Sequence, residues 1–195
     1  MGFAISWMAV KGRKKEDVLS FYGFSETTEV EEIPESDISS SELPSGWYFL
    51  WFNECESPFV QADVVSELSQ DCSVIVCVIE EHVMYSRSEF WVNGEQKWKI
   101  VHNFQNGIYD LETSGVLPDY FDLLKCEIFE KQDEEGGVKA DVDLIFDLPL
   151  EPIKRLTLFK HDEFTPELEG QEYTVLVANN QISSTPISKP WWKLW

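Results

Sequence analysis

Two groups of side chains in this chain combine residue types that can do acid–base or metal chemistry. Glu80, Glu81 and His82 are consecutive and follow an apolar run, and a histidine beside carboxylates can act as a base or hold a metal ion. Asp141 and Asp143 have the spacing of cation ligands, but their neighbours are apolar and the glycine of a calcium loop is missing. We expect a turn histidine at position 82 and a solvated strand edge at the two aspartates. A hydrolase or metal-dependent enzyme is the alternative.

The motifs of common active sites are absent from the sequence. It contains no GxGxxG, GxxxxGK[ST], GxSxG or HExxH pattern. His102 lies in an alternating segment, which predicts a half-exposed strand residue. His161 follows a predicted helix, where a cation suits the C-terminal end of the helix dipole. These observations favour a protein that is not an enzyme and that uses no cofactor.

Acidic residues are concentrated in one region of the chain. The protein has 36 Asp and Glu against 15 Lys and Arg, a formal charge of −21. Residues 16–86 hold 16 of the acids and no lysine or arginine, whereas the other 124 residues hold 20 acids and 15 bases. A field of that sign attracts basic partners and repels the phosphates of nucleic acids and anionic lipids.

The most acidic part of this region is Ser25–Gly46, which is rich in serine and contains two prolines. Such a composition predicts a mobile loop, with a short edge strand near Thr27–Ile33. We expect a basic partner to contact the acidic side chains of this loop, of the strand end at 80–81 and of a second acidic loop after a helix. These residues are Glu26, Glu29, Glu31, Glu32, Glu35, Asp37, Glu80, Glu81, Asp133, Glu134 and Glu135.

Hydrophobic patterning predicts the elements that position these side chains. Strands are expected at Phe3–Val10, Trp47–Phe52, Ser73–Ile79, Tyr109–Thr113 and Tyr173–Ala178, with a hairpin of Val83–Val92 and Glu95–Phe104 around Asn93-Gly94. Helices are expected at Glu16–Tyr22, Ser57–Gln70, Pro149–Phe159 and from Leu117 to the acidic stretch at Asp133. Because the strands come in hairpins and runs, we predict an α+β fold, with a largely antiparallel sheet and three to four helices in one domain, residues 1–178.

The remaining residues, 179–195, read as a polar tether followed by a tryptophan-rich tail. Trp191, Trp192 and Trp195 supply three indoles in five residues. We expect this tail to cover an edge of the core; docking on a partner comes second, and insertion at a membrane interface would make the protein a peripheral membrane adaptor.

The four cysteines and the N-terminus indicate the compartment. The cysteines show no CxxC spacing, so we expect reduced thiols in a cytoplasmic protein. No segment approaches the roughly 18 apolar residues of a membrane span, and the first ten residues lack the basic start of a signal peptide.

Charge, aromatic content and missing motifs together predict a cytoplasmic interaction module that binds a basic protein and does not bind nucleic acid. In its most specific form it is an inhibitor or immunity-type protein that neutralises a cationic enzyme such as a nuclease toxin. A nuclease needs a basic cleft for phosphates, and an acidic loop can occupy that cleft.

Overall fold

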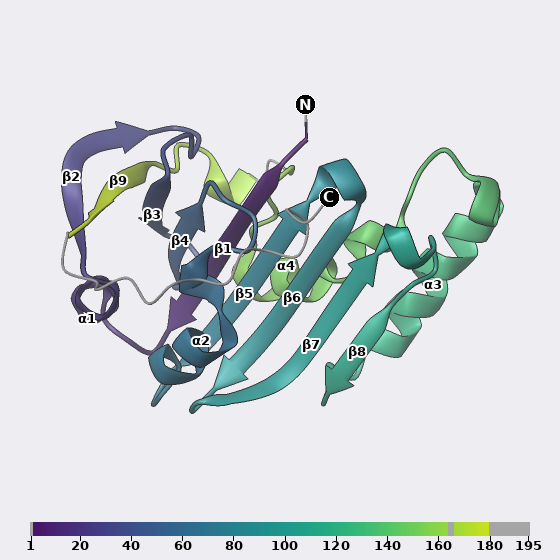
Figure 1. Ribbon diagram of the computed structural model, residues 1–195, viewed down its shortest axis with the longest axis horizontal. Coiled ribbons are helices and arrows are strands. Elements are labelled where there is room, and N and C mark those ends of the chain that lie inside the picture. Colours follow the sequence, from purple (N-terminus) through teal and green to yellow (C-terminus); the bar gives the residue numbers. More distant parts are fainter. Residues whose placement is uncertain (1, 164–165, 180–195) are drawn as a thin grey trace.

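The computed structural model describes residues 2–163 and 166–179, and in these residues nine antiparallel strands form one sheet (Figure 1). The strands are β1 (Ala4–Lys11), β2 (Phe24–Glu31), β3 (Ile38–Glu42), β4 (Tyr48–Phe52), β5 (Ser73–Glu80), β6 (Tyr85–Val92), β7 (Glu95–Asn103), β8 (Glu112–Gly115) and β9 (Tyr173–Ala178). Their order across the sheet is β2-β9-β3-β4-β1-β5-β6-β7-β8. The α-helices in the same part of the chain are α1 (Lys15–Tyr22), α2 (Ala62–Leu68), α3 (Phe121–Glu134) and α4 (Leu150–Thr157). The predicted α+β fold is confirmed.

Strand β1 occupies the middle of the sheet, where it pairs with β4 on one side and β5 on the other. Consecutive residues of a strand point to opposite faces, and here Trp7 and Met8 are both almost fully buried. Both faces of the central strands are therefore covered, which explains why β1, β4 and β5 read as continuous apolar runs. The prediction of a central strand at Ser73–Ile79 is confirmed.

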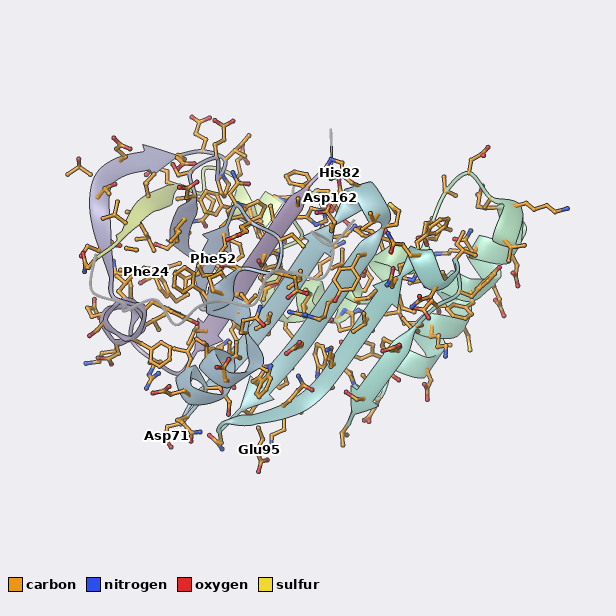
Figure 2. All side chains as sticks on the ribbon, in the orientation of Figure 1. Phe24, Phe52, Asp71, His82, Glu95 and Asp162 are labelled. Carbon is orange, nitrogen blue, oxygen red and sulfur yellow. The ribbon has the colours of Figure 1, made fainter. Side chains whose placement is uncertain are left out.

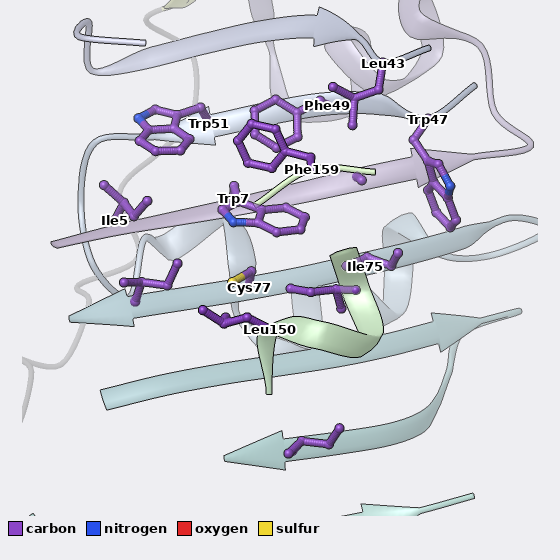
Figure 3. Close-up of a cluster of buried hydrophobic side chains, with 14 of the residues drawn as sticks. Ile5, Trp7, Leu43, Trp47, Phe49, Trp51, Ile75, Cys77, Leu150 and Phe159 are labelled. Carbon is purple, nitrogen blue, oxygen red and sulfur yellow. The ribbon is translucent and has the colours of Figure 1, made fainter. Parts of the chain in front are cut away.

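Each face of the sheet has its own hydrophobic core. On one face, residues of α3 and α4 pack against the central strands, and the rings of Trp7, Phe49 and Phe159 lie against one another, with centroids 4.5–5.5 Å apart (Figure 3). On the other face, α1 and α2 contribute Val18, Leu68 and their neighbours. Full burial of a large apolar side chain contributes about 1.5–3 kcal/mol, so the two cores hold the helices to the sheet.

The hairpin of β6 and β7 forms as predicted. Asn93 and Gly94 have φ angles of 54° and 78°, the left-handed backbone that a type I′ turn requires at both central residues. The turn fixes the register of β6 against β7, and this pair extends the sheet toward β8.

The prediction of a loop at Ser25–Gly46 is wrong for the segment that forms β3. The short edge strand expected near Thr27–Ile33 is confirmed as β2, which begins three residues earlier, at Phe24, and ends at Glu31. Asp, Glu and Ser are weak strand formers, but β3 is held between β4 and β9. The small Ser39 and Ser40 side chains fit this buried position, and Ser41 Oγ donates a hydrogen bond to the carbonyl of Glu172 at 2.7 Å. The strand character of this segment comes from β9, far along the chain, and not from its own composition.

Three other elements differ from their predicted bounds. The helix expected at Ser57–Gln70 is split, because Gln61 has an extended backbone (ψ 147°) between a 3-10 turn and α2. The short strand expected at Tyr109–Thr113 lies further along, at β8. Helix α3 runs to Glu134, so the acidic segment expected as a loop begins inside the last helical turn.

None of the helices in the described ranges is long and apolar enough to cross a bilayer. The tryptophan-rich tail, with Trp191, Trp192 and Trp195, lies outside the described residues. All four cysteines are free thiols, and Cys77 is fully buried.

Candidate binding surfaces

The most acidic surface is an edge of the sheet, formed by β2 and its connection to β3, residues 24–37. We call it the acidic edge. In the described sheet β2 pairs with β9 alone, and Figure 2 shows the side chains around it projecting outward. The exposed carboxylates of the acidic edge are Glu26, Glu29, Glu32, Glu35 and Asp37.

Two carboxylates of the acidic edge have partners within the protein. Glu26 forms an ion pair with Lys15 at 2.9 Å, and both side chains are about a third exposed, so the pair contributes at most about 1 kcal/mol. Glu31 accepts hydrogen bonds from the backbone N–H groups of Glu35 and Ser36. Burial raises the pKa of Glu31, but the hydrogen bonds to its charged form outweigh burial and lower it. Glu31 therefore closes the turn and is a poor contact for a partner.

Two aliphatic side chains lie exposed among these carboxylates. Val30 is 54% exposed and Ile33 is 68% exposed. The pairing of β2 with β9 also shifts register between Glu26 and Val30. Charges and bulges on an edge strand keep it from pairing with other copies of the chain, so the acidic edge protects the sheet as well as offering a charged surface.

The turn between β5 and β6 carries the Glu80-Glu81-His82 group. His82 is largely exposed, and its Nδ1 lies 2.7 Å from Glu80 Oε1. The backbone N–H of His82 donates to the same carboxylate. The predicted turn histidine is confirmed, with Glu80 as its local partner.

Glu81 reaches a different histidine, His161. Its Oε1 lies 3.0 Å from His161 Nε2, and its Oε2 accepts a hydrogen bond from the Phe3 backbone N–H at 2.8 Å. The His161 side chain is 1% exposed and meets the Phe3 ring edge-on. His161 thus contacts the carboxylate of Glu81, and its Nδ1 lies 3.6 Å from Asp162 Oδ1; the sequence predicts only an interaction with the C-terminal end of the helix dipole.

The lysine before His161 is enclosed by carboxylates. Lys160 is 6% exposed, and its Nζ lies 2.9 Å from Glu163, 3.0 Å from Asp147 and 3.3 Å from Asp162. Burial lowers the pKa of Lys160, but these carboxylates raise it above its ordinary value. Within residues 2–163 and 166–179, no group of three or more His, Cys, Asp or Glu side chains is arranged to hold a metal ion. In this cluster the carboxylates compensate the charge of Lys160. The contact with Asp147 connects the segment after α4 to the turn before it.

The sequence did not predict that His102 is buried and pairs with Asp143. His102 Nε2 lies 2.8 Å from Asp143 Oδ2, and its Nδ1 lies 2.6 Å from the carbonyl oxygen of Asp110. His102 is 0% exposed, so the expectation of a half-exposed strand residue is wrong. Asp143 caps a 3-10 turn and is not on a strand edge, while Asp141 is exposed and stands apart from the pair. The sequence offered one indication of the role of Asp143: it comes just before a short apolar helical turn, where an aspartate often accepts hydrogen bonds from the first backbone N–H groups.

The third acidic group, Asp133–Glu135, lies at the C-terminal end of α3. Asp133 accepts a hydrogen bond from the Tyr109 hydroxyl, and Glu134 and Glu135 are exposed. Figure 1 shows α3 at the opposite end of the sheet from β2. With strands spaced about 4.8 Å apart, the two edges of a nine-stranded sheet are separated by roughly 38 Å. The acidic residues predicted as contacts therefore lie in three separate places.

Comparison with protein-family models, with curated proteins and with solved structures finds no match to this chain. A function has to be inferred from the surfaces themselves.

Proposed function

We propose that this protein is an interaction module that binds a basic protein through the acidic edge. The observation that supports this most directly is an unbalanced run of exposed carboxylates with two exposed aliphatic side chains, Val30 and Ile33, among them. Residues 16–86 contain no lysine or arginine that could neutralise those carboxylates, and Lys15 pairs with only one of them. A cationic surface would relieve their mutual repulsion.

The charges and the aliphatic side chains make different contributions to such a complex. Complementary charge raises the association rate, toward about 10⁸ M⁻¹s⁻¹ or more at low salt, and selects the partner. Burial of Val30 and Ile33, each about half to two-thirds exposed, would add roughly 1–2 kcal/mol per side chain. Affinity should therefore depend on both, and the association rate mainly on charge.

In its most specific form, the proposal is an inhibitor or immunity-type protein that acts in the cytoplasm and blocks a cationic enzyme such as a nuclease toxin. The basic cleft of a nuclease binds phosphates, and the acidic edge carries charge of the opposite sign on a strand and the turn that follows it. The enzymatic alternative at Glu80–His82 or Asp141/Asp143 and the membrane-adaptor alternative through the tail remain predictions without a supporting observation.

The test compares two variants with the same change in net charge. One reverses three carboxylates of the acidic edge: Glu29→Lys, Glu32→Lys and Glu35→Lys. The control reverses three exposed carboxylates of α3: Glu127→Lys, Glu130→Lys and Glu134→Lys. Each immobilised protein is exposed to lysate of the source cells at about 50 mM and about 500 mM salt, where screening differs strongly, and captured proteins are identified by mass spectrometry.

We expect wild-type protein and the α3 control to capture the same basic protein at low salt, and the acidic-edge variant to lose at least about tenfold of it. Loss in both variants, or in neither, would refute a role for the acidic edge. The inhibitor form requires, in addition, that stoichiometric wild-type protein blocks the activity of the captured enzyme.

A further inference from the structure

Residues 180–195, which we call the distal segment, differ in charge from the rest of the chain. All 36 Asp and Glu of the protein precede residue 173, so the distal segment contains no acid. Its charged and aromatic residues are Lys189, Trp191, Trp192, Lys193 and Trp195. A segment that is both cationic and aromatic complements an acidic surface that also exposes apolar side chains.

The distal segment begins beside the acidic edge. Strand β9 pairs with β2 (Figure 1), and the described chain ends at Asn179, whose backbone N–H donates a hydrogen bond to the Gly23 carbonyl oxygen at 2.8 Å. The Ser25 hydroxyl donates to the side-chain oxygen of Asn179 at 3.1 Å. The chain therefore leaves the sheet at the first residues of β2.

The distal segment is long enough to reach every part of the acidic edge. Phe24 and Ile33 are at most about 30 Å apart, because nine residue steps of a strand cover about 3.3 Å each. An extended chain of 16 residues spans up to about 55 Å. Tethering also gives a binding segment a local concentration in the mM range, so that weak contacts are sufficient for docking.

The acidic edge offers both kinds of contact that the distal segment can make. Val30 is 54% exposed and Ile33 is 68% exposed, and an indole that covers them removes apolar surface from water on both sides. The carboxylates around them lie in residues 16–86, which contain no lysine or arginine. The lysines of the distal segment supply the missing cations.

A second group of exposed aliphatic side chains fits the distal segment less well. Val116, Leu123 and Val138 are 66–84% exposed, but they lie around β8 and α3, roughly 38 Å from β2 across the sheet. Helix α3 also contains Lys125 and Lys131, so its charge is less one-sided. Distance and charge both favour the acidic edge.

We propose that the distal segment docks on the acidic edge of its own molecule and is displaced when a basic partner binds. The indoles cover Val30 and Ile33, and the two lysines pair with the neighbouring carboxylates. A partner then binds only the fraction of molecules in which the acidic edge is open, which lowers its apparent affinity. The docking follows from residues of this chain alone, whereas its regulatory effect rests on the proposed function.

Methyl NMR of the full chain, labelled at Val and Ile, tests the docking. The indole variant carries Trp191→Ala, Trp192→Ala and Trp195→Ala. An aromatic ring stacked on a methyl group shifts the methyl resonance upfield, so the signals of Val30 and Ile33 should move downfield in this variant. Val30→Ala and Ile33→Leu identify those signals by their loss. The signals of Val138, which is 75% exposed beyond α3, should stay in place.

Two further comparisons test the role of charge. The indole substitutions should move the Val30 and Ile33 signals in the wild-type background and in the α3 control background, but not in the acidic-edge variant, where docking is already lost. A second variant, Lys189→Glu with Lys193→Glu, keeps the rings and should release them as the indole variant does. Thermal denaturation of each variant checks folding.

Three results would overturn the docking. The first is that the signals of Val30 and Ile33 stay in place in both the indole variant and the lysine variant. The second is that the indole substitutions move them equally in the acidic-edge background, because docking would then not need the carboxylates. The third is a shift that depends on protein concentration between about 50 and 500 μM, because the segment would then bind a second copy of the chain.

Displacement is tested with an oligolysine peptide, titrated at constant ionic strength. The indole variant should bind this probe at least about threefold more tightly than the wild type, and equal affinities would overturn the regulatory effect. The lysate experiment tests the proposed function separately. Docking without capture of a basic protein would refute that proposal alone, and capture without docking would refute this inference alone.

Discussion

Although Asp143 lies in a short connection after α3, its replacement should destabilise the protein strongly. Its two carboxylate oxygens have separate partners. Oδ2 lies 2.8 Å from His102 Nε2, and Oδ1 accepts hydrogen bonds from the backbone N–H groups of Ile145 and Phe146 at 3.1 and 3.2 Å. The His102 side chain is 0% exposed and that of Asp143 is 5% exposed, so water cannot replace a lost contact.

Two substitutions at this position separate those contacts. Asp143→Asn keeps an oxygen for the backbone N–H groups but removes the charge beside His102, and a hydrogen bond to a charged group contributes about 1.5–3 kcal/mol. Asp143→Ala also removes the cap, about 1 kcal/mol more, and leaves a buried imidazole with one partner fewer. We therefore expect losses of about 2 kcal/mol for the asparagine variant and about 3–5 kcal/mol for the alanine variant.

Urea unfolding, followed by tryptophan fluorescence and by far-ultraviolet circular dichroism, measures both losses. The two probes must give coincident transitions for a two-state free energy of unfolding to apply. The matched control is Asp141→Asn, at an exposed position two residues away, which should cost less than about 0.5 kcal/mol. If Asp143→Asn were no more destabilising than this control, the buried pair would have no energetic role and the reasoning would fail.

Three further predictions concern the burial of cysteines, an ion pair and backbone strain at a glycine. Cys126, the exposed cysteine, should react with a disulfide reagent within minutes in the native protein, and the buried Cys72 and Cys77 should react only after unfolding; fast reaction of either buried thiol would contradict the described burial. Glu163 accepts hydrogen bonds from two lysines, which lower its pKa below the ordinary 4.5. Its stabilising effect is therefore present above that value and is lost as the pH falls through the lowered pKa, so Glu163→Gln should cost roughly 0.5–1 kcal/mol at neutral pH and progressively less as the pH falls through that pKa. A pH-independent difference in urea midpoints would argue against it. Gly115 and Gly23 have similar φ angles of 79° and 66°, but a Cβ at Gly115 would lie 2.1 Å from the Lys97 carbonyl oxygen, whereas one at Gly23 would meet nothing within 4 Å. Gly115→Ala should thus be more destabilising than Gly23→Ala by at least about 1 kcal/mol, and equal thermal shifts would show that the close approach is absent.

The elements that the sequence predicted correctly are those whose signal is local. Strands β1, β4 and β5 are buried on both faces, so their residues are almost all apolar. The β6–β7 turn is specified by the two residues Asn93 and Gly94. In both cases the physical requirement falls on neighbouring residues and can be recognised there.

The features that the sequence did not predict depend on residues that are distant in the chain. The polar residues of β3 form a strand because β4 and β9 flank it. Alternation placed His102 on one face of its strand, but could not show that Asp143 would cover that face. The acidic contacts were predicted from the charge of residues 16–86 and from a second acidic stretch at 133–135, and the sequence could not show that β2 and α3 lie at opposite ends of the sheet (Figure 1).

The place of β9 in the sheet has a consequence for the order in which the protein can fold. Strands β2 and β3 are close in sequence, yet they do not pair with each other, since β9 lies between them. The roughly 140 residues from Glu31 to Tyr173 take about 10–30 s to synthesise at typical rates. During that time β2 is without its partner and β3 has one open side. The carboxylates of β2 then act as gatekeepers on the ribosome, because charge discourages an unpaired strand from joining the wrong neighbour.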